Sequence, residues 1–443
     1  MNIYQRVLEN PSQFNFDVPN LGPCLIDSPV RSDRAFINDN ARVLIDTDLA
    51  AVNALAARLG RLPTFEKAGP RAKIFHDPAW SSAAILTAGG LCPGLNHVIK
   101  GLVEILSFGY NVKTIYGIRY GFRGLVPRHG LSPVKLDPDA VDTIHTLGGT
   151  ILGSSRGQQD SAEIIDTLIR RDINLLFCVG GDGTLRAARE IAEMCVAQKR
   201  SISVVGIPKT IDNDLNFVGH SFGFETAIAE TGPVIDAAHI EARGAHNGIG
   251  LVKLMGRDSG FIAAYATVAN PVVNMCLIPE MEFAMDGKNG LLAALDRRFD
   301  SGKGHCVIVV AEGAGQNFFE GAAEQRDPSG NLLKQDIGEY LKNRINAHFK
   351  KRGVETSVKY FDPSYTIRSV PAKGSDAVRC YHLARNAVHA ALAGRTNCVV
   401  GNHHDSHALV PISLATVERQ KIDLQGNLWK SVLDATRQES LFE

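Results

Sequence analysis

Short apolar runs alternate with amphipathic stretches from about residue 81 onward. Continuous apolar runs of strand length cover 83–87, 175–179 and 203–207. The first two lead through glycine-rich turns into apolar positions three or four residues apart, the spacing of a buried helix face. Uninterrupted apolar strands followed by helices predict a largely parallel sheet that helices cover on both faces.

The helical pattern is clearest directly after the first two strands. Its apolar positions are Leu95, Val98, Ile99, Leu102, Val103 and Leu106 after the first, and Leu185, Ala188, Ile191, Ala192 and Cys195 after the second. The alternation returns later, with strands at 249–254, 275–278 and 306–311 and helices at 258–269 and 288–300. The sequence therefore predicts the α/β class, built as α/β layers with mostly parallel sheets.

Charge and cysteine content narrow the possible classes of protein. The 443 residues hold 47 Lys and Arg against 47 Asp and Glu, which argues against coating nucleic acid or an anionic membrane. No apolar run reaches the roughly 18–20 residues that span a bilayer, and the N-terminus lacks the apolar core of a secretory signal. The eight cysteines form no Cys-x-x-Cys pair. We therefore expect a cytoplasmic protein with reduced cysteines, without nucleic-acid or membrane partners.

Two glycine loops follow predicted strands, at 88–96 (AGGLCPGLN) and at 178–184 (CVGGDGT). Glycines let a backbone approach a polyphosphate closely, and the exposed N–H groups of a helix start favour its charge. Asp182, between two glycines, is placed to face a Mg²⁺–phosphate unit. A tight strand-to-helix turn is the purely structural alternative.

A polar segment at 208–214 (PKTIDND) follows the third strand. It puts an ammonium, a hydroxyl, two aspartates and an asparagine within seven residues. One aspartate could simply cap a helix, but that role does not account for the whole cluster. A carboxylate near a substrate hydroxyl can accept its proton during phosphoryl transfer. The sequence thus indicates a site for a phosphate-rich ligand at the ends of the strands.

Seven motifs follow one another in a diagnostic order. They are GGLCPGLN (89–96), GSSRG (153–157), GGDGT (180–184), PKTIDND (208–214), MGRDSG (255–260), AEG (311–313) and YTIR (365–368). GGDGT alone also occurs in other kinases of small molecules, but the ordered set resembles the 6-phosphofructokinase family. It is most similar to the long ATP-dependent branch found in plants, trypanosomatids and some bacteria.

The resemblance implies an architecture of two Rossmann-like three-layer domains. A nucleotide-binding domain would span 77–216 with 388–420, and a sugar-phosphate-binding domain would span 217–387. The sequence pattern itself, with few periodic signals before residue 77 apart from a helix near Leu49–Leu59, predicts that residues 1–76 form an N-terminal extension wrapping the main body, and 421–443 would form a C-terminal tail. The family also implies a homo-oligomer, a dimer or a tetramer.

The resemblance further implies transfer of phosphate from Mg²⁺–ATP to the 1-hydroxyl of fructose 6-phosphate, a step of glycolysis. The implied catalytic residues are Asp212 as the base, Thr210 and Arg257. The residues implied to contact the nucleotide are Gly90, Arg156, Gly157, Gly181, Asp182, Gly183 and Thr184. Asp182 is also implied to bind Mg²⁺. The residues implied to bind the sugar phosphate are Thr210, Ile211, Asp212, Met255, Gly256, Arg257, Glu312, Tyr365 and Arg368.

Several positions depart from the short bacterial relatives. Leu91 replaces an aspartate, and Gly248 stands where those relatives carry an arginine that reaches a neighbouring subunit's substrate. Lys359 lies at the position where the family has another cation that reaches across to a neighbouring subunit. Gly183 replaces the aspartate of pyrophosphate-using relatives, which indicates ATP as donor, whereas Lys209 is shared by both groups and does not discriminate.

Two other functions stay open on sequence alone. One is a pyrophosphate-dependent phosphofructokinase, and the other is a non-catalytic regulatory paralogue, against which the presence of both Asp182 and Asp212 argues. The cluster at 402–407 (NHHDSH) could suggest a metal site. Because it lies between two predicted strands, we interpret it as a polar turn without a functional role.

Overall fold

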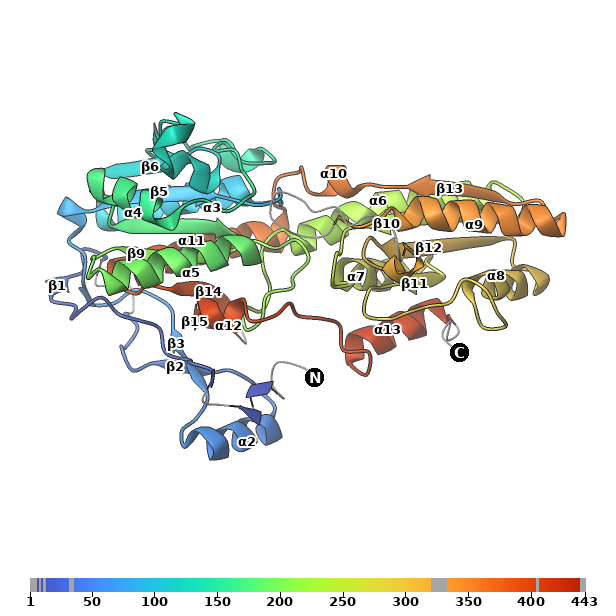
Figure 1. Ribbon diagram of the computed structural model, residues 1–443, viewed down its shortest axis with the longest axis horizontal. Coiled ribbons are helices and arrows are strands. Elements are labelled where there is room, and N and C mark those ends of the chain that lie inside the picture. The colour runs from blue at the N-terminus through green and yellow to red at the C-terminus, as the bar shows by residue number, and fades with distance from the viewer. Residues whose placement is uncertain are drawn as a thin grey trace. The chain divides into compact units, whose positions relative to one another are not determined.

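The computed structural model describes residues 6–7, 9–10, 13–31, 36–319, 333–403 and 406–438. The chain forms two compact units. The first comprises Met1–Gly223 and Ser369–Glu418, and the second comprises Phe224–Arg368 and Arg419–Glu443. Each unit is a sheet covered by helices, as the alternation of strands and helices in the sequence predicts (Figure 1).

The first unit contains a nine-stranded sheet. Its strands run in the order β2 (Arg42–Leu44), β3 (Thr64–Lys67), β15 (Ser406–Pro411), β14 (Cys398–His403), β9 (Ser203–Pro208), β8 (Leu175–Gly180), β5 (Ser82–Thr87), β6 (Thr114–Ile118) and β7 (Val134–Lys135). The pairs from β14 to β6 are parallel, whereas the outer pairs on both sides are antiparallel. The parallel centre matches the prediction.

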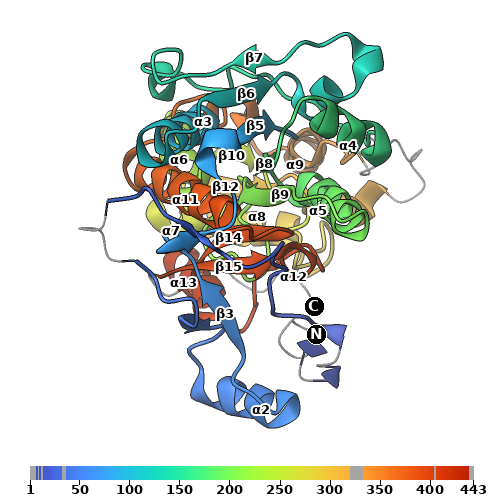
Figure 2. The same cartoon turned by 90° about the vertical axis from the view of Figure 1, so that its left-hand side faces the viewer.

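Alternate residues of the central strands enter two different cores. In β5, Ala83 and Ile85 pack into the core with α3 (Leu95–Glu104) and α11 (Gly374–Leu392), whereas Ala84 and Leu86 pack into the other. The second core contains α4 (Ser161–Arg170) and α5 (Asp182–Ala197). A strand buried on both faces has no polar side, which explains its continuous apolar sequence (Figure 2).

The N-terminal segment, predicted as an extension wrapping the main body, adds strands to the sheet of the first unit. β3 pairs antiparallel with β15, with Ala408 opposite Lys67, and β2 pairs with β3. The predicted helix is present as α2 (Leu49–Leu59), and β1 (Ile26–Asp27) pairs with β4 (Lys73–Ile74). Pairing with residues more than 300 positions later leaves no local signal in the sequence.

The unit boundaries also differ from the predicted ones at 217 and 388. They fall between Gly223 and Phe224 and between Arg368 and Ser369. The reason is α11, whose Cys380, Leu383 and Ala384 are buried in the same core as α3. Residues 369–387 therefore fold with the first unit rather than with the second.

The second unit has a four-stranded parallel sheet. Its order is β11 (Met275–Leu277), β12 (His305–Ala311), β10 (Gly248–Leu254) and β13 (Ser357–Phe361). The helices α8 (Leu291–Asp300) and α9 (Ile337–Arg352) share one core with the sheet. The other helices of the unit are α6 (Phe224–Arg243), which contacts β10, β12 and β13, α7 (Phe261–Ala269), and the short α10 (Ser364–Ile367).

The predicted C-terminal tail contains a packed helix. α13 (Asn427–Thr436) contacts α7 and buries Trp429 and Val432. The remaining short helix, α12 (Ile412–Ala415), follows β15 in the first unit and contacts α5. The tail is thus part of the folded body as far as residue 438.

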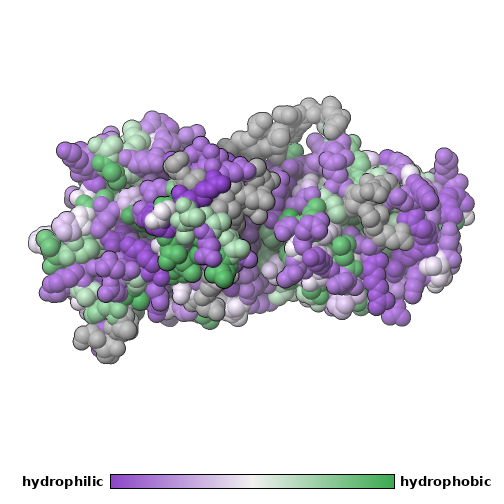
Figure 3. Space-filling model, turned by 90° about the horizontal axis from the view of Figure 1, so that it is seen from below, coloured by the Kyte–Doolittle hydropathy of each residue, from purple (hydrophilic) through white to green (hydrophobic). Residues whose placement is uncertain are grey.

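The surface matches the balanced composition. Hydrophilic side chains dominate the face drawn in Figure 3, with apolar residues in smaller groups between them. Among the helices of the described residues, none is long and apolar enough to cross a membrane. All eight cysteines are free, and seven of them are buried.

One buried histidine makes the stability of the first unit depend on pH. His76 is 4% exposed, its Nε2 lies 3.0 Å from Ser203 Oγ, and its backbone N–H donates to Leu392 O. Burial lowers the pKa of His76 to about 4 from its ordinary 6.5. The unfolded chain therefore binds this proton at a higher pH than the folded chain does.

We predict that stability falls as pH drops from about 6.5 toward 4, by about 3 kcal/mol from this residue. His76→Gln keeps a polar partner for Ser203 but cannot titrate. Urea unfolding midpoints of both proteins at pH 7.5 and pH 5 measure the effect. The variant should lose less stability between the two conditions, and an equal loss in both proteins would contradict the assignment.

Candidate active site

Three loops leave one edge of the first sheet side by side. β9, β8 and β5 are adjacent and parallel, with Thr87 opposite Val179 and Gly180 opposite Pro208. The backbone bonds continue past the strand ends, since Ala88 N–H donates to Val179 O and Lys209 N–H donates to Gly180 O, both at 3.0 Å. The glycine loops and the 208–214 segment therefore start together, as predicted.

Gly89 lets two of these loops approach each other. Its φ of +87° lies in the region that favours glycine, and an added Cβ would lie 3.1 Å from Lys209 Nζ and 3.9 Å from Thr184 Oγ1. An ammonium and a hydroxyl thus lie beside the half-buried backbone of Gly89. This arrangement suits an anionic ligand close to the main chain.

The segment 153–157 docks onto the same glycine loop. Gly89 N–H donates to Ser155 O at 3.1 Å, and Ser154 Oγ donates to Gly89 O at 2.6 Å. These bonds place Arg156 and Gly157 next to the loop. Burial is the largest cause that lowers the pKa of Lys209, and Arg156 lowers it further, so the two cations lie within electrostatic range.

The start of α5 carries the remaining predicted nucleotide residues. Gly181 precedes the helix, Asp182 is its first residue, and Thr184 is buried beneath them. The Asp182 carboxylate pairs with Arg186 at 3.0 Å. Gly183 is exposed, and a Cβ there would meet no atom within 4 Å. Position 183 therefore accepts a side chain without a steric clash inside the protein.

Within the 208–214 loop, buried side chains hold the backbone in shape. Thr210 Oγ1 donates to Asp214 Oδ1 at 2.6 Å, and Ser221 N–H donates to Asn213 Oδ1 at 2.8 Å. Asp214 and Asn213 thus hold the loop. Asp212 is half-buried, and its charge acts on Lys209 by raising the pKa of that lysine, against the effect of burial.

In the second unit the ends of β10 and β12 bring Arg257 and Glu312 together. Glu312 N–H donates to Leu254 O and Gly313 N–H donates to Gly256 O, both at 2.9 Å. A Cβ on Gly313 would lie 1.9 Å from Arg257 O, so only glycine permits this approach. The AEG motif is therefore the close neighbour of MGR.

The pKa of Glu312 shows which cations of the second unit lie close enough to affect this carboxylate. Burial raises the pKa of Glu312, whereas Arg257, Lys253 and Arg368 lower it. The Arg368 guanidinium lies over the ring of Tyr365, with its Cζ 4.6 Å from the ring centre. Arg257, Lys253 and Arg368 thus all lie within electrostatic range of one carboxylate, an arrangement that can bind a phosphate and orient hydroxyl groups.

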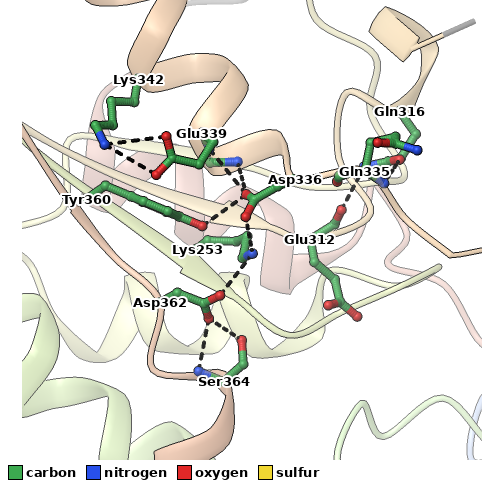
Figure 4. Close-up of polar contacts among 11 residues, drawn as sticks. Lys253, Glu312, Gln316, Gln335, Asp336, Glu339, Lys342, Tyr360, Asp362 and Ser364 are labelled. Carbon is green, nitrogen blue, oxygen red and sulfur yellow. Dashed lines mark hydrogen bonds and ion pairs between the residues drawn. The ribbon is translucent and has the colours of Figure 1, made fainter. Parts of the chain in front are cut away.

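Lys253 forms ion pairs that hold the start of α9 and the segment before α10 close to the end of β10. Its Nζ lies 3.1 Å from an Asp336 oxygen and 2.9 Å from an Asp362 oxygen, and Tyr360 donates to Asp336 (Figure 4). Asp336 caps α9, and Asp362 leads into the helix that carries Tyr365. The sequence analysis missed this role, although a lone lysine inside the apolar run 249–254 was its signal.

Other positions from the sequence analysis have different surroundings. A Cβ on Gly248 would lie 2.1 Å from Ala242 O, so a larger residue there would require the backbone to move. Lys359 is exposed on β13. His403, in the β14–β15 hairpin, is buried against Phe65 and contacts Phe217 O. His404 and Asp405 lie outside the described residues.

The predicted residues thus fall into two groups, one in each unit. The first unit holds Gly90, Arg156, Gly157, Gly181, Asp182, Gly183, Thr184, Lys209, Thr210, Ile211 and Asp212, and the second holds Met255, Gly256, Arg257, Glu312, Tyr365 and Arg368. Within each group, adjacent parallel strands bring the motifs together.

Comparison with known proteins agrees with this arrangement. Residues 82–391 match the family model described as "Phosphofructokinase". The ATP-dependent 6-phosphofructokinase of Borreliella burgdorferi is 48% identical over 378 residues, covering 84% of this chain and 85% of that protein. The enzyme of the same description from Amycolatopsis methanolica is 46% identical over 435 residues, covering 95% and 94%.

The fold also matches solved structures of low sequence identity. A pyrophosphate-dependent phosphofructokinase from Marinobacter aquaeolei superposes with a TM-score of 0.65 at 20% identity, covering 80% of this chain and 91% of that one. At this identity the likeness concerns the fold alone. With the family model matching most of the sequence and the two relatives matching 84% and 95% of it, the chain belongs to the phosphofructokinase family.

Proposed function

We propose that this chain is an ATP-dependent 6-phosphofructokinase, which transfers the terminal phosphoryl group of ATP to the 1-hydroxyl of fructose 6-phosphate. The observation that carries the proposal is the meeting of GGLCPGLN, GGDGT and PKTIDND at one edge of a parallel sheet. Relatives that carry the ATP-dependent name are 46% to 48% identical over most of the chain. Phosphoryl transfer requires little beyond positioning and charge stabilisation, which these loops supply.

We assign the binding of the phosphoryl donor, ATP, to the first unit. The polyphosphate would lie along the backbone of Gly89 and Gly90 and the start of α5, where N–H groups and the helix dipole favour negative charge. Lys209 and Arg156 add positive charge next to this backbone. Gly181, Gly183 and Thr184 complete the contact surface, and Gly157 follows Arg156.

Mg²⁺ fits this donor site through Asp182. Mg²⁺ in kinases is commonly held by one or two protein carboxylates together with the substrate's phosphates, so a dedicated cluster of ligands is not needed. In the described part of the chain no group of three or more His, Cys, Asp or Glu could hold a metal by itself. When bound, the ion would neutralise charge on the transferring phosphoryl group.

The residues for the acceptor are assigned by the chemistry of their side chains. Arg257 and Arg368 would bind the 6-phosphate, because a planar guanidinium matches phosphate oxygens in a bidentate way. Glu312 would accept hydrogen bonds from sugar hydroxyls, with Met255, Gly256 and Tyr365 around them. Asp212 would accept the proton of the 1-hydroxyl, with Thr210 and Ile211 beside it.

The direct test is the identity of the products. Phosphorus NMR of the protein with ATP, Mg²⁺ and fructose 6-phosphate should show fructose 1,6-bisphosphate and ADP appearing in equal amounts. ATP hydrolysis without formation of fructose 1,6-bisphosphate would contradict the proposal, and no turnover at all would favour a non-catalytic regulatory protein.

Location and assembly are part of the same proposal. The eight free cysteines suit a reducing compartment, so we assign the protein to the cytoplasm. We also assign it a homo-oligomeric state, a dimer or a tetramer, which sedimentation equilibrium can measure directly.

The role of Asp212 leads to the first functional prediction. Asp212→Asn preserves size and hydrogen bonding but cannot take a proton at neutral pH, so kcat should fall by about 10²–10⁴-fold. Dissociation constants for ATP and fructose 6-phosphate should change little. The matched control is Asp166→Asn, which alters an exposed carboxylate on α4 and should leave kcat unchanged. Near-normal turnover of the first variant would remove Asp212 from the mechanism.

Donor choice is tested at position 183. A side chain fits there without contact inside the protein, so Gly183→Asp should fold normally. Its carboxylate would stand beside Asp182 and oppose the ATP phosphates, raising the KM for ATP by about tenfold or more. Gly183→Ala adds bulk without charge and should change that KM by about twofold at most. Equal effects of both substitutions would assign the preference to size alone.

The acceptor site is tested at Arg368. Arg368→Ala removes the guanidinium assigned to the 6-phosphate and should raise the KM for fructose 6-phosphate about 10- to 100-fold. The KM for ATP should stay within about twofold. Arg243→Ala, at an exposed arginine of the same unit, is the control. A parallel rise for both substrates would count against the assignment.

A further inference from the structure

Lys253 is a charged residue on an otherwise apolar face of β10. Ile249 and Leu251, which precede it on that face, are fully buried in the core that contains α9. Strand alternation puts Lys253 on the same side of the sheet. Its side chain is only 12% exposed, so much of its charge is removed from water. Such burial is costly unless carboxylates compensate the charge.

Two carboxylates from different segments share the Lys253 ammonium. Its Nζ lies 3.1 Å from Asp336 Oδ2, 2.9 Å from Asp362 Oδ2 and 5.8 Å from the centre of the Tyr360 ring (Figure 4). Burial lowers the pKa of Lys253, but the two carboxylates and the Tyr360 hydroxyl outweigh burial, so the pKa is raised. The lysine is therefore charged at neutral pH and binds both carboxylates.

The stability of α9 does not account for a lysine at this place. Asp336 caps α9, because its Oδ1 accepts the N–H groups of Gly338 and Glu339 at 3.0 and 3.2 Å. A carboxylate has the charge that a helix start favours, whereas an ammonium has the opposite charge. Asp336 would thus stabilise α9 without Lys253. The distinct contribution of the lysine is its second partner, Asp362.

Asp362 shapes the turn into α10. Its Oδ1 accepts the N–H of Ser364 at 3.1 Å and also the Ser364 hydroxyl, while its Oδ2 pairs with Lys253. The strand register supports this ion pair, because each partner directly follows one of the paired residues Val252 and Phe361. One carboxylate therefore connects the end of β10 to the first residue of α10.

α10 is too short to keep its orientation without such a contact. It has four residues, and an isolated helix of that length is unstable in water. The buried side chain of Ile367 fixes its end, and Asp362 fixes its start. The helix carries Tyr365, and Arg368 follows directly with its Cζ 4.6 Å from the Tyr365 ring centre. The placement of this arginine therefore depends on the Lys253–Asp362 pair.

The Asp336 side of the network leads to the backbone of Glu312. Gln316 Nε2 donates to Glu312 O at 2.9 Å and to Gln335 O at 3.1 Å, and Gln316 Oε1 accepts the Gln335 N–H at 3.0 Å (Figure 4). Gln335 directly precedes Asp336. Lys253 is thus connected both to the segment that carries Arg368 and to the segment that carries Glu312.

We infer that Lys253 is a positioning residue of the acceptor site, which orders Tyr365 and Arg368 through Asp362 and so sets the affinity for the phosphorylated sugar. The inference rests on the proposed function, since that function assigns the 6-phosphate to Arg368. Lys253 acts through its ion pair with Asp362, whereas its pair with Asp336 mainly stabilises α9.

The test separates affinity from turnover. Lys253→Met keeps the length of the side chain but removes its charge, so the KM for fructose 6-phosphate should rise about tenfold or more. The KM for ATP should stay within about twofold and kcat within about threefold. Lys253→Arg restores the charge and should keep all three constants within about threefold of the wild type. The matched control is Lys342→Met, which removes an ammonium paired with Glu339 of its own helix and should change none of them.

The two carboxylates can be tested separately. Asp362→Asn should raise the KM for fructose 6-phosphate about fivefold or more, because an amide cannot form the ion pair. Combined with Lys253→Met, it should add little further, since the two residues act as one pair. Asp336→Asn leaves a residue that caps helices well and should change this KM by about threefold at most. If circular dichroism shows that Lys253→Met does not fold, Asp362→Asn makes the same test.

The outcomes distinguish this inference from the proposed function. Normal wild-type turnover, with an unchanged KM for fructose 6-phosphate in Lys253→Met and Asp362→Asn, would overturn the inference alone. So would equal rises in the KM for both substrates, or a rise in Lys253→Arg as large as in Lys253→Met, because lost packing rather than a lost ion pair would then be the cause. Calorimetric titration of the wild type with fructose 6-phosphate is the remaining measurement. An absence of both binding and turnover would overturn the proposed function and this inference with it.

Discussion

The parallel pairing of β9, β8 and β5 is the constraint on which the donor site depends. Parallel strands present their carboxyl ends at one edge of the sheet, so three segments up to about 120 residues apart in sequence leave the sheet together. The strands can be buried on both faces because their side chains are apolar throughout. Lys209, Thr184 and the Gly89 backbone therefore meet because of strand order, while the glycines supply the room.

The second unit applies the same constraint with different chemistry. Adjacent β12, β10 and β13 gather Glu312, Arg257 and the segment that carries Arg368. Here the closeness depends on Gly313, which lets the AEG backbone touch that of Arg257. Lys253 then joins Asp336 and Asp362 and so ties the start of α9 to the end of β13. The edge of the first unit's sheet thus suits a polyphosphate, which can lie along the glycine backbone. The edge of the second unit's sheet suits a single phosphate, which the arginines can bind.

The sequence predicted those features that arise from neighbouring residues. The strands, α2, α5 and the glycine loops all have local patterns, and the structure contains them at the predicted places. It did not predict that β3 joins the sheet through β15, or that α11 packs with α3, because those contacts join residues hundreds of positions apart. It also could not separate Asp214, which holds Thr210, from Asp212, since both are aspartates in the same short loop.

The most direct test of the whole account is the choice of phosphoryl donor. The initial rate of fructose 1,6-bisphosphate formation should be measured with ATP and with pyrophosphate, at saturating Mg²⁺ and fructose 6-phosphate. With Gly183 leaving the start of α5 open to a nucleotide, the account predicts rapid turnover with ATP and almost none with pyrophosphate. Faster turnover with pyrophosphate than with ATP would contradict it.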